Sequence, residues 1–290
     1  MLWVLAAVFL WSWLGILAKA LYAFGAGPLE VVSLRVLLAW AALLPFAIWK
    51  RWWGLLSPGS LPKVFFYSLF SVVLNYLGFY LALRWISVTA AVVVVYTYPA
   101  LVLLLSRSFL GEPFGRTEAA LALTTAGLFL VAGGHRLHRL AVNGPGVGFA
   151  LLTAFSIAVY NVAGKRLVRE IDPWALLFWG FTFGAAILWG ARSAGAHALP
   201  VLPPAGWGLL ICLALFPTLG SYGLYLVALK RMRAGHAALL STLEPMLAAV
   251  WAAVVLGERP GPLQALGGVM VIGAAAHIFR AQLRLRRDTH

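Results

Sequence analysis

Residues 235–258 read GHAALLSTLEPMLAAVWAAVVLGE and hold one acid and one proline near the middle of an otherwise apolar run. As a helix that rises about 1.5 Å per residue, this stretch is long enough to cross the roughly 30 Å hydrocarbon core of a bilayer. A carboxylate at that depth is costly, and a proline removes a helical hydrogen bond. Glu244 and Pro245 therefore predict a special site in the middle of a membrane span.

The composition extends this membrane character to the whole chain. Of the 290 residues 63% are hydrophobic and only 10% are charged, whereas soluble domains carry about 25% charged residues. The net charge of +14 does not indicate nucleic acid, because the basic residues lie between apolar runs and form no stripe with interleaved aromatic residues. The single cysteine, Cys212, excludes an intramolecular disulfide and a cysteine-based metal site. We predict an all-α membrane protein without a cofactor.

Apolar runs separated by short polar breaks predict ten transmembrane helices. We place them at about 2–21, 29–49, 62–83, 87–106, 114–133, 146–165, 173–192, 206–229, 234–256 and 260–280. If the N-terminus is cytoplasmic, most Lys and Arg residues fall in cytoplasmic segments, as the retention of positive loops requires. We therefore expect both termini in the cytoplasm, and the basic tail, residues 281–290, to attract anionic lipid.

The two halves of the sequence repeat at a constant offset of about 146 residues. The most informative matches are the identities that involve Lys, Tyr, Pro and Glu. They are Lys19/Lys165, Tyr76/Tyr222, Pro99/Pro245 and Glu112/Glu258. Each half, 1–140 and 141–280, holds five predicted spans, so the second half must enter the membrane upside down. Inverted repeats of this kind are typical of secondary transporters, whose substrate site lies at the repeat interface near the midplane.

Several motifs resemble those of EamA-type members of the drug/metabolite transporter superfamily. They are Trp11-Ser12 in the first span, Arg35 in the second, Tyr98-Pro99 followed by Leu110-Gly111-Glu112, and Leu243-Glu244-Pro245 followed by Leu256-Gly257-Glu258. The resemblance covers essentially the whole chain. It implies export of a small metabolite across a bacterial inner membrane, through a central cavity that opens alternately to the two sides. It also implies that the fifth and tenth spans are peripheral, but it does not name the substrate.

Glu244 is the leading candidate for a binding residue, since an ionisable group at mid-span is a functional hypothesis by default. It would bind a substrate ammonium group or take up a coupling proton. The structural alternative is that Glu244 is a protonated or hydrogen-bonded acid that only contributes to the packing of the helix kinked at Pro245. Its counterpart in the first half is Tyr98, a further expected substrate contact, which lies next to the kink expected at Pro99, so the repeats differ here. Arg35 would either extend to the nearby surface or meet a substrate carboxylate with its fork of donors.

Aromatic and polar residues at helical spacing would form the rest of the cavity wall, or would serve as ordinary packing and interface residues. We expect substrate contacts from Trp11, Asn75, Tyr76, Tyr80, Ser156, Tyr160, Tyr222 and Tyr225. Aromatic walls with a few polar groups suit a partly apolar ligand, such as a hydrophobic or aromatic amino acid.

Two pairs of charged residues related by the repeat would act as gates or braces. Lys19 and Glu258 both fall at the predicted outer edge of the membrane, and Lys165 and Glu112 both fall at the inner edge. The alternative is that each charge is solvated at the interface, where an ion pair contributes little.

The favoured function is therefore secondary transport of a small organic metabolite, and not catalysis. A drug or lipid exporter of the same fold is the nearest alternative, and an integral membrane enzyme or a passive channel is a more distant one. An enzyme would need clustered acids, histidines or nucleophiles, while the chain has only 8 acidic residues. The substrate, a proton as the coupling ion, and the state as monomer or homodimer are left open by the sequence.

Overall fold

The computed structural model describes residues 1–55, 57–112, 117–131, 143–195, 199–257 and 261–287. Within these ranges the chain is helical without any strand, which confirms the all-α prediction. Eight helical stretches are long and apolar enough to cross a membrane. They are Leu2–Ala23, Pro28–Trp49, Leu61–Ala82, Ala90–Leu110, Gly144–Leu167, Pro173–Ala194, Pro204–Arg231 and Ala234–Val255. The chain is thus a multi-pass membrane protein. Two further apolar helices, Ala120–Val131 and Pro262–His277, are shorter, so a total of ten spans stays a prediction.

Three of the eight stretches are single helices: α3 (Pro28–Trp49), α9 (Gly144–Leu167) and α10 (Pro173–Ala194). The other five are interrupted. Their parts are α1 (Leu2–Trp11) and α2 (Leu14–Ala23); α4 (Leu61–Ser68), η2 (Leu69–Leu74) and α5 (Asn75–Ala82); α6 (Val88–Val95) and α7 (Tyr98–Leu110); α11 (Pro204–Leu213), η4 (Ala214–Gly220) and α12 (Ser221–Arg231); α13 (Ala234–Ser241) and α14 (Glu244–Leu256). The remaining elements are η1 (Trp52–Leu55), α8 (Thr117–Val131) and α15 (Pro262–Arg287).

Local sequence signals explain where these helices begin. Asp172 caps α10 by accepting hydrogen bonds from the backbone N–H groups of Trp174 (2.9 Å) and Ala175 (3.2 Å), and Pro173 suits the first helical position because it lacks an N–H. Asn143 caps α9 in the same way, accepting from Gly146 at 2.9 Å. Its Nδ2 also donates to the carbonyl oxygen of Trp85 at 3.0 Å, which fixes the start of α9 to the chain that follows α5.

The interruptions recur at the repeat offset. Helices α6 and α7 begin at residues 88 and 98, and α13 and α14 begin at residues 234 and 244. The two π-helical segments, η2 and η4, also occupy equivalent positions. Helices α7 and α14 end at Gly111 (φ 66°) and Gly257 (φ 68°), both in the left-handed conformation that glycine adopts without a steric penalty. The sequence repeat therefore corresponds to a repeat in backbone conformation.

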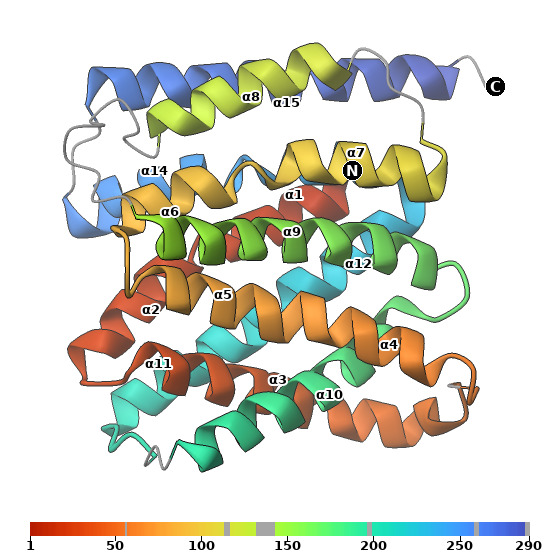
Figure 1. Ribbon diagram of the computed structural model, residues 1–290, viewed down its shortest axis with the longest axis vertical. Coiled ribbons are helices and arrows are strands. Elements are labelled where there is room, and N and C mark those ends of the chain that lie inside the picture. Colours follow the sequence, from red (N-terminus) through yellow and green to blue (C-terminus); the bar gives the residue numbers. More distant parts are fainter. Residues whose placement is uncertain (56, 113–116, 132–142, 196–198, 258–260, 288–290) are drawn as a thin grey trace.

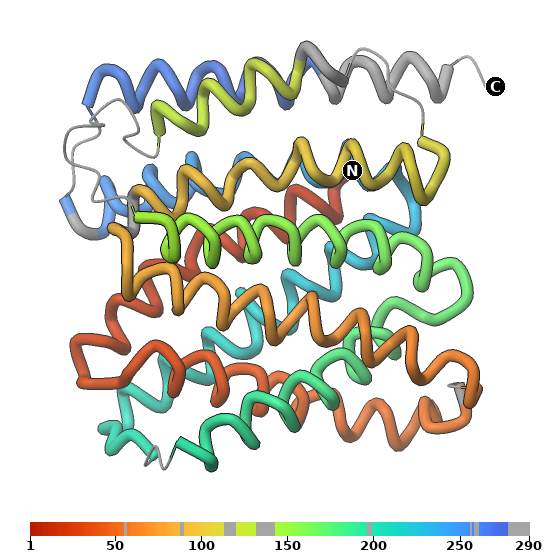
Figure 2. Tube along the Cα trace, in the orientation of Figure 1, coloured from red at the N-terminus to blue at the C-terminus, as the bar shows by residue number. Residues whose placement is uncertain are grey.

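Helices α8 and α15 form a separate pair at one end of the molecule (Figures 1 and 2). They approach closely at Gly127 and Gly267, where a Cβ atom on Gly127 would lie 2.7 Å from the carbonyl oxygen of Gly267. The other helices pack around α9 and α12, and α3 and α10 lie at the opposite end of the molecule (Figure 1). The peripheral position expected for these two segments agrees with this arrangement.

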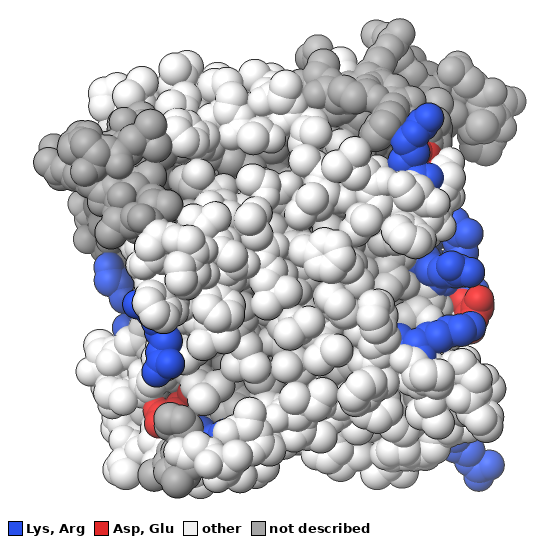
Figure 3. All heavy atoms as spheres, in the orientation of Figure 1, with Lys and Arg blue, Asp and Glu red and all other residues white. Residues whose placement is uncertain are grey.

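The charged side chains gather at the two edges of the molecule where the helices end (Figure 3). Between these edges the visible face consists of other residues, and many large apolar side chains are exposed, such as Phe46, Leu104, Phe216 and Val254. Exposed apolar side chains between two charged borders are the surface that a membrane-spanning protein presents to lipid.

Candidate functional site

The helical stretches Ala90–Leu110 and Ala234–Val255 are both interrupted near their middles, immediately before Tyr98 and Glu244. Pro99 and Pro245 are the second residues of the new helices, where the missing N–H is not needed. The spans are thus divided into two helices at the positions where the sequence predicts kinks. Glu244 lies in the first turn of α14, where the helix dipole favours a negative charge.

Glu244 has no partner among the described residues, since its carboxylate makes neither a hydrogen bond nor an ion pair with them. Its side chain is partly exposed, as is every residue from Leu243 to Ala249. Electrostatic interactions place it close to Tyr96, Tyr98 and Tyr222, which belong to other spans. An acid at mid-span that is accessible and lacks a partner is available to bind a ligand or a proton.

Tyr98, the counterpart of Glu244, is engaged in the structure. Its hydroxyl is buried and lies 2.8 Å from Ser241 Oγ, and it donates a weaker hydrogen bond of 3.4 Å to the Ala238 carbonyl. These contacts fix α7 to α13. The two positions related by the repeat therefore have different uses, with one polar group paired and the other unpaired.

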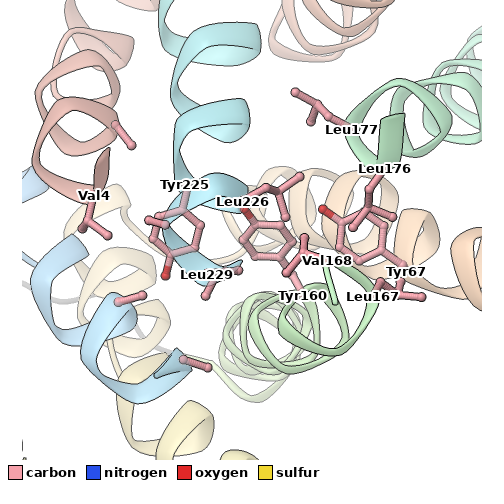
Figure 4. Close-up of a cluster of buried hydrophobic side chains, with 14 of the residues drawn as sticks. Val4, Tyr67, Tyr160, Leu167, Val168, Leu176, Leu177, Tyr225, Leu226 and Leu229 are labelled. Carbon is pink, nitrogen blue, oxygen red and sulfur yellow. The ribbon is translucent and has the colours of Figure 1, made fainter. Parts of the chain in front are cut away.

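A cluster of aromatic rings joins α1, α9 and α12. The centroid of the Trp11 ring lies 5.1 Å from those of Tyr222 and Tyr225, and Tyr160 lies 5.9 Å from the same two tyrosines. Tyr67 extends the cluster at 5.8 Å from Tyr160, and Figure 4 shows Tyr67, Tyr160 and Tyr225 lying close together. The structure therefore brings four predicted site residues together, and adds Tyr67, which the sequence analysis did not identify.

Arg35 lies inside the protein with only 5% of its surface exposed, so it does not extend to the membrane surface. Its guanidinium carbon is 4.4 Å from the centre of the Tyr76 ring, a geometry that favours a cation–π interaction. Its Nε has no hydrogen-bond partner. Electrostatic interaction also places it close to Tyr222. Arg35 and Tyr76 thus belong to the same region as the aromatic cluster.

Three predicted site residues have other surroundings. Ser156 is fully buried and donates to the carbonyl oxygen of Leu152 in its own helix at 2.7 Å. Asn75 donates a long hydrogen bond of 3.4 Å to Ser71 O, and Tyr80 lies beneath the Arg84 guanidinium at 5.9 Å. None of these contacts connects the three residues to Glu244.

Sequence reasoning missed Asn161 and Ser241, which organise buried tyrosines. Asn161 Oδ1 accepts a hydrogen bond from Tyr225 Oη at 2.6 Å, and Ser241 lies beside Tyr98. Asn161 directly follows Tyr160, and an amide at mid-span is a signal that could have identified it, because buried polar groups need partners.

The Lys165 and Glu112 side chains meet the same connection between α12 and α13. Lys165 Nζ donates to the carbonyl oxygens of Leu229 (2.6 Å) and Met232 (2.8 Å), while Glu112 accepts from the N–H groups of Ala234 and Gly235. The two charges also interact electrostatically. In the corresponding pair, Lys19 lies in the middle of α2, and Glu258 lies outside the described residues.

The comparisons with known proteins agree on a family. The model of the EamA-like transporter family matches residues 1–133 and again residues 144–280. The chain is 30% identical over 264 residues to the threonine/homoserine exporter RhtA of Escherichia coli K12, which covers 89% of this chain and 84% of RhtA. It is 34% identical over 146 residues to the uncharacterized transporter YcbK of Bacillus subtilis, and this match spans about half of each chain, 49% and 47%.

A solved structure described only as the crystal structure of a protein has the same fold. It superposes with a TM-score of 0.81 at 21% sequence identity, covering 99% of this chain and 97% of the other. At this identity the match concerns the fold alone.

Proposed function

The chain belongs to the EamA-like transporter family, which points to a transporter rather than an enzyme. We propose that it exports a hydrophobic or aromatic amino acid across a bacterial inner membrane. It acts as a secondary transporter by alternating access, with the substrate between the two halves of the chain. Glu244 is a partly exposed residue whose carboxylate has no partner among the described residues, and this is the observation that carries the proposal.

Two further observations support an amino-acid substrate. RhtA, with which this chain shares 30% identity, is named as an exporter of threonine and homoserine. The aromatic rings of Trp11, Tyr160 and Tyr222 lie in the region of Glu244, and aromatic surfaces suit an apolar side chain. Glu244 would then bind the ammonium group of the substrate, or exchange it for a proton.

The recurrence of helix interruptions supports two five-helix halves, residues 1–140 and 141–280, inserted with opposite orientations. In this arrangement α8 and α15 are the fifth and tenth spans. Tyr76 and Tyr222 are equivalent positions of the repeat and lie close enough to interact electrostatically, as residues at an interface between the two halves would. A site that lies between inverted repeats fits a mechanism in which one half rocks against the other.

The accessibility of the ninth span supports a state that is open on one side. Every residue of α13 is buried, whereas residues 243–249, in and beside the first half of α14, are all partly exposed. With cytoplasmic termini, α13 lies in the inner half of the membrane. In our proposal this state is closed toward the cytoplasm and open to the outside, which is one of the two states that alternating access needs.

Reconstitution into liposomes tests the function. We expect saturable counterflow of a hydrophobic or aromatic amino acid by the wild-type protein, measured with and without a proton gradient. Glu244→Gln should lose most of this counterflow or its dependence on the gradient, while the exposed loop variant Glu170→Gln should retain both. Flux without saturation would indicate a passive channel. Unchanged substrate range and coupling in Glu244→Gln would exclude Glu244 as the central binding group.

A further inference from the structure

Several buried donors near Tyr222 have no acceptor. The atoms concerned are all buried and make no hydrogen bond with the described residues: Trp11 Nε1, Arg35 Nε, Tyr76 Oη and Tyr160 Oη. Native proteins leave few buried polar atoms unpaired, and each such atom calls for a ligand, a water molecule or an ion. Four unpaired donor atoms in one region therefore indicate a binding site for a ligand, an ion or water that supplies acceptor atoms.

The positions of the four residues connect them around Tyr222. The Trp11 and Tyr160 rings lie 5.1 and 5.9 Å from the Tyr222 ring. Tyr76 lies beneath Arg35 at 4.4 Å. The Tyr76 and Tyr222 hydroxyls are close enough to interact electrostatically, but Tyr76 Oη makes no hydrogen bond of normal geometry. Tyr76 and Tyr222 are partly exposed, so a ligand can reach the group.

The chemistry of these donors selects an anionic acceptor. The Arg35 guanidinium and the Trp11 indole can only donate, and both tyrosine hydroxyls can donate as well. Arg35 makes no ion pair with any described residue, and only 5% of its surface is exposed. A buried positive charge without a counter-ion is costly. A planar carboxylate would relieve this cost, because it accepts two parallel hydrogen bonds from a guanidinium.

Tyr222 also lies close to a negative charge. It interacts electrostatically with both Arg35 and Glu244, so a cation and an acid that form no ion pair with the described residues both lie near this tyrosine. A ligand that carries both charges would direct its carboxylate toward Arg35 and its ammonium toward Glu244.

From these contacts we infer that Arg35, Trp11, Tyr76 and Tyr160 form a carboxylate-binding subsite, and that the transported molecule is a zwitterionic α-amino acid. The inference rests on the proposed function, which it deepens by assigning the second charged group of the substrate. Arg35 provides the charge, and the indole and the two hydroxyls fix the orientation of the carboxylate.

A binding experiment tests the subsite without relying on transport. The thermal stability of the purified protein is measured with L-phenylalanine, L-phenylalaninamide, 3-phenylpropionate and phenethylamine, and with L-threonine and its amide. We expect the amides to bind at least roughly tenfold more weakly than the amino acids, because they lack the charged acceptor. Arg35→Gln should remove the preference for the amino acid over its amide, and Arg35→Lys should retain part of this preference. Glu244→Gln should keep the preference for the carboxylate but lose the preference for ligands that carry an ammonium group.

The hydroxyl contacts are tested by substitutions that keep the aromatic ring. Tyr76→Phe and Tyr160→Phe should each weaken the preference for a carboxylate by several-fold. Trp179→Phe is the matched control, because the Trp179 indole already donates to the Trp52 carbonyl oxygen at 3.3 Å, away from the cluster. This variant should keep the wild-type preference.

The outcomes separate the two proposals. If Arg35→Gln retains the wild-type discrimination, or if no carboxylate binds the wild-type protein more tightly than its amide, the subsite is excluded and water fills the region. If 3-phenylpropionate binds through Arg35 but no amino acid gives counterflow in liposomes, the subsite stands and the amino-acid transport function fails.

Discussion

Lys165 and Glu112 bind opposite sides of the same short connection, the residues between α12 and α13. Lys165 donates to the last carbonyl oxygens of the preceding segment, and Glu112 accepts from the N–H groups of Ala234 and Gly235 at 2.9 and 3.3 Å. Each charge thereby satisfies helix-terminal groups that would otherwise be unpaired. Glu112 comes from the first half of the chain and Lys165 from the second, and together they stabilise the connection between α12 and α13.

Lys165→Met should lower the free energy of unfolding by about 2 kcal/mol. The substitution leaves the Leu229 and Met232 carbonyl oxygens without their donor and Glu112 without a nearby cation, and hydrogen bonds to charged groups are worth roughly that amount. Thermal unfolding of the detergent-solubilised protein measures the change. Lys230→Met is the control, because Lys230 is exposed at the end of α12. Equal stability of the two variants would show that the hydrogen bonds from Lys165 to the carbonyl oxygens at the end of α12 do not stabilise the protein.

Gly267→Ala should weaken the pairing of α8 with α15. A methyl group on Gly267 would collide with the Gly127 backbone, and backbone atoms cannot move aside as a flexible side chain can. The expected result is a lower unfolding temperature and faster proteolysis of the C-terminal segment.

The control for this pairing is Gly208→Ala in α11, where a Cβ atom meets nothing within 4 Å. That variant should be neutral or slightly stabilising, because alanine favours a helix by up to about 1 kcal/mol over glycine. An equally stable Gly267→Ala protein would contradict the close contact.

Two of the five helix interruptions, those before α7 and α14, could be predicted from sequence because their causes are local. Pro99 and Pro245 cannot lie inside an unbroken helix without losing a hydrogen bond, and both mark the start of a new helix. The glycines that end α7 and α14 carry an equally local signal. The π-helical segments were not predicted, since of the two only η4 contains a proline, Pro217.

The candidate site could be predicted only in part, because side-chain direction depends on tertiary packing. Tyr160 and Ser156 lie one helical turn apart and were predicted together. Tyr160 joins the aromatic cluster, whereas Ser156 bonds to its own helix. Glu112 was expected to pair with Lys165, but its hydrogen bonds go to backbone N–H groups. Charge patterns in a sequence do not reveal backbone partners.

Tyr225→Phe should cost about 1–3 kcal/mol of stability, because it leaves the buried Asn161 side-chain oxygen without its donor. The double variant Asn161→Leu/Tyr225→Phe should recover part of the loss, since it removes the unpaired acceptor as well. Thermal unfolding of Tyr225→Phe, of Asn161→Leu and of the double variant measures the coupling. Purely additive losses would mean that the 2.6 Å hydrogen bond contributes nothing specific.

Trp251 should stabilise the junction between the broken first span and α14. Its indole N–H donates to Ser12 Oγ at 2.8 Å, and its ring stacks on Trp13 with the centroids 4.8 Å apart. Ser12 lies in the interruption between α1 and α2, so this contact connects two segments that alternating access would move relative to one another. Ser12→Ala and Trp251→Phe should each lower stability, with a coupling of about 1 kcal/mol in a double-mutant cycle.

The same two variants should alter transport more than stability alone explains, because they loosen a contact between the first helical stretch and α14, two segments that alternating access would move relative to one another. We expect counterflow rates to change several-fold at a temperature where all variants remain folded. Trp40→Phe is the matched control, since the Trp40 indole makes an equivalent hydrogen bond of 2.9 Å to Thr182, which links α3 and α10. A similar change in counterflow in Trp40→Phe would show that the effect is general and that the Trp251 junction has no special part in transport.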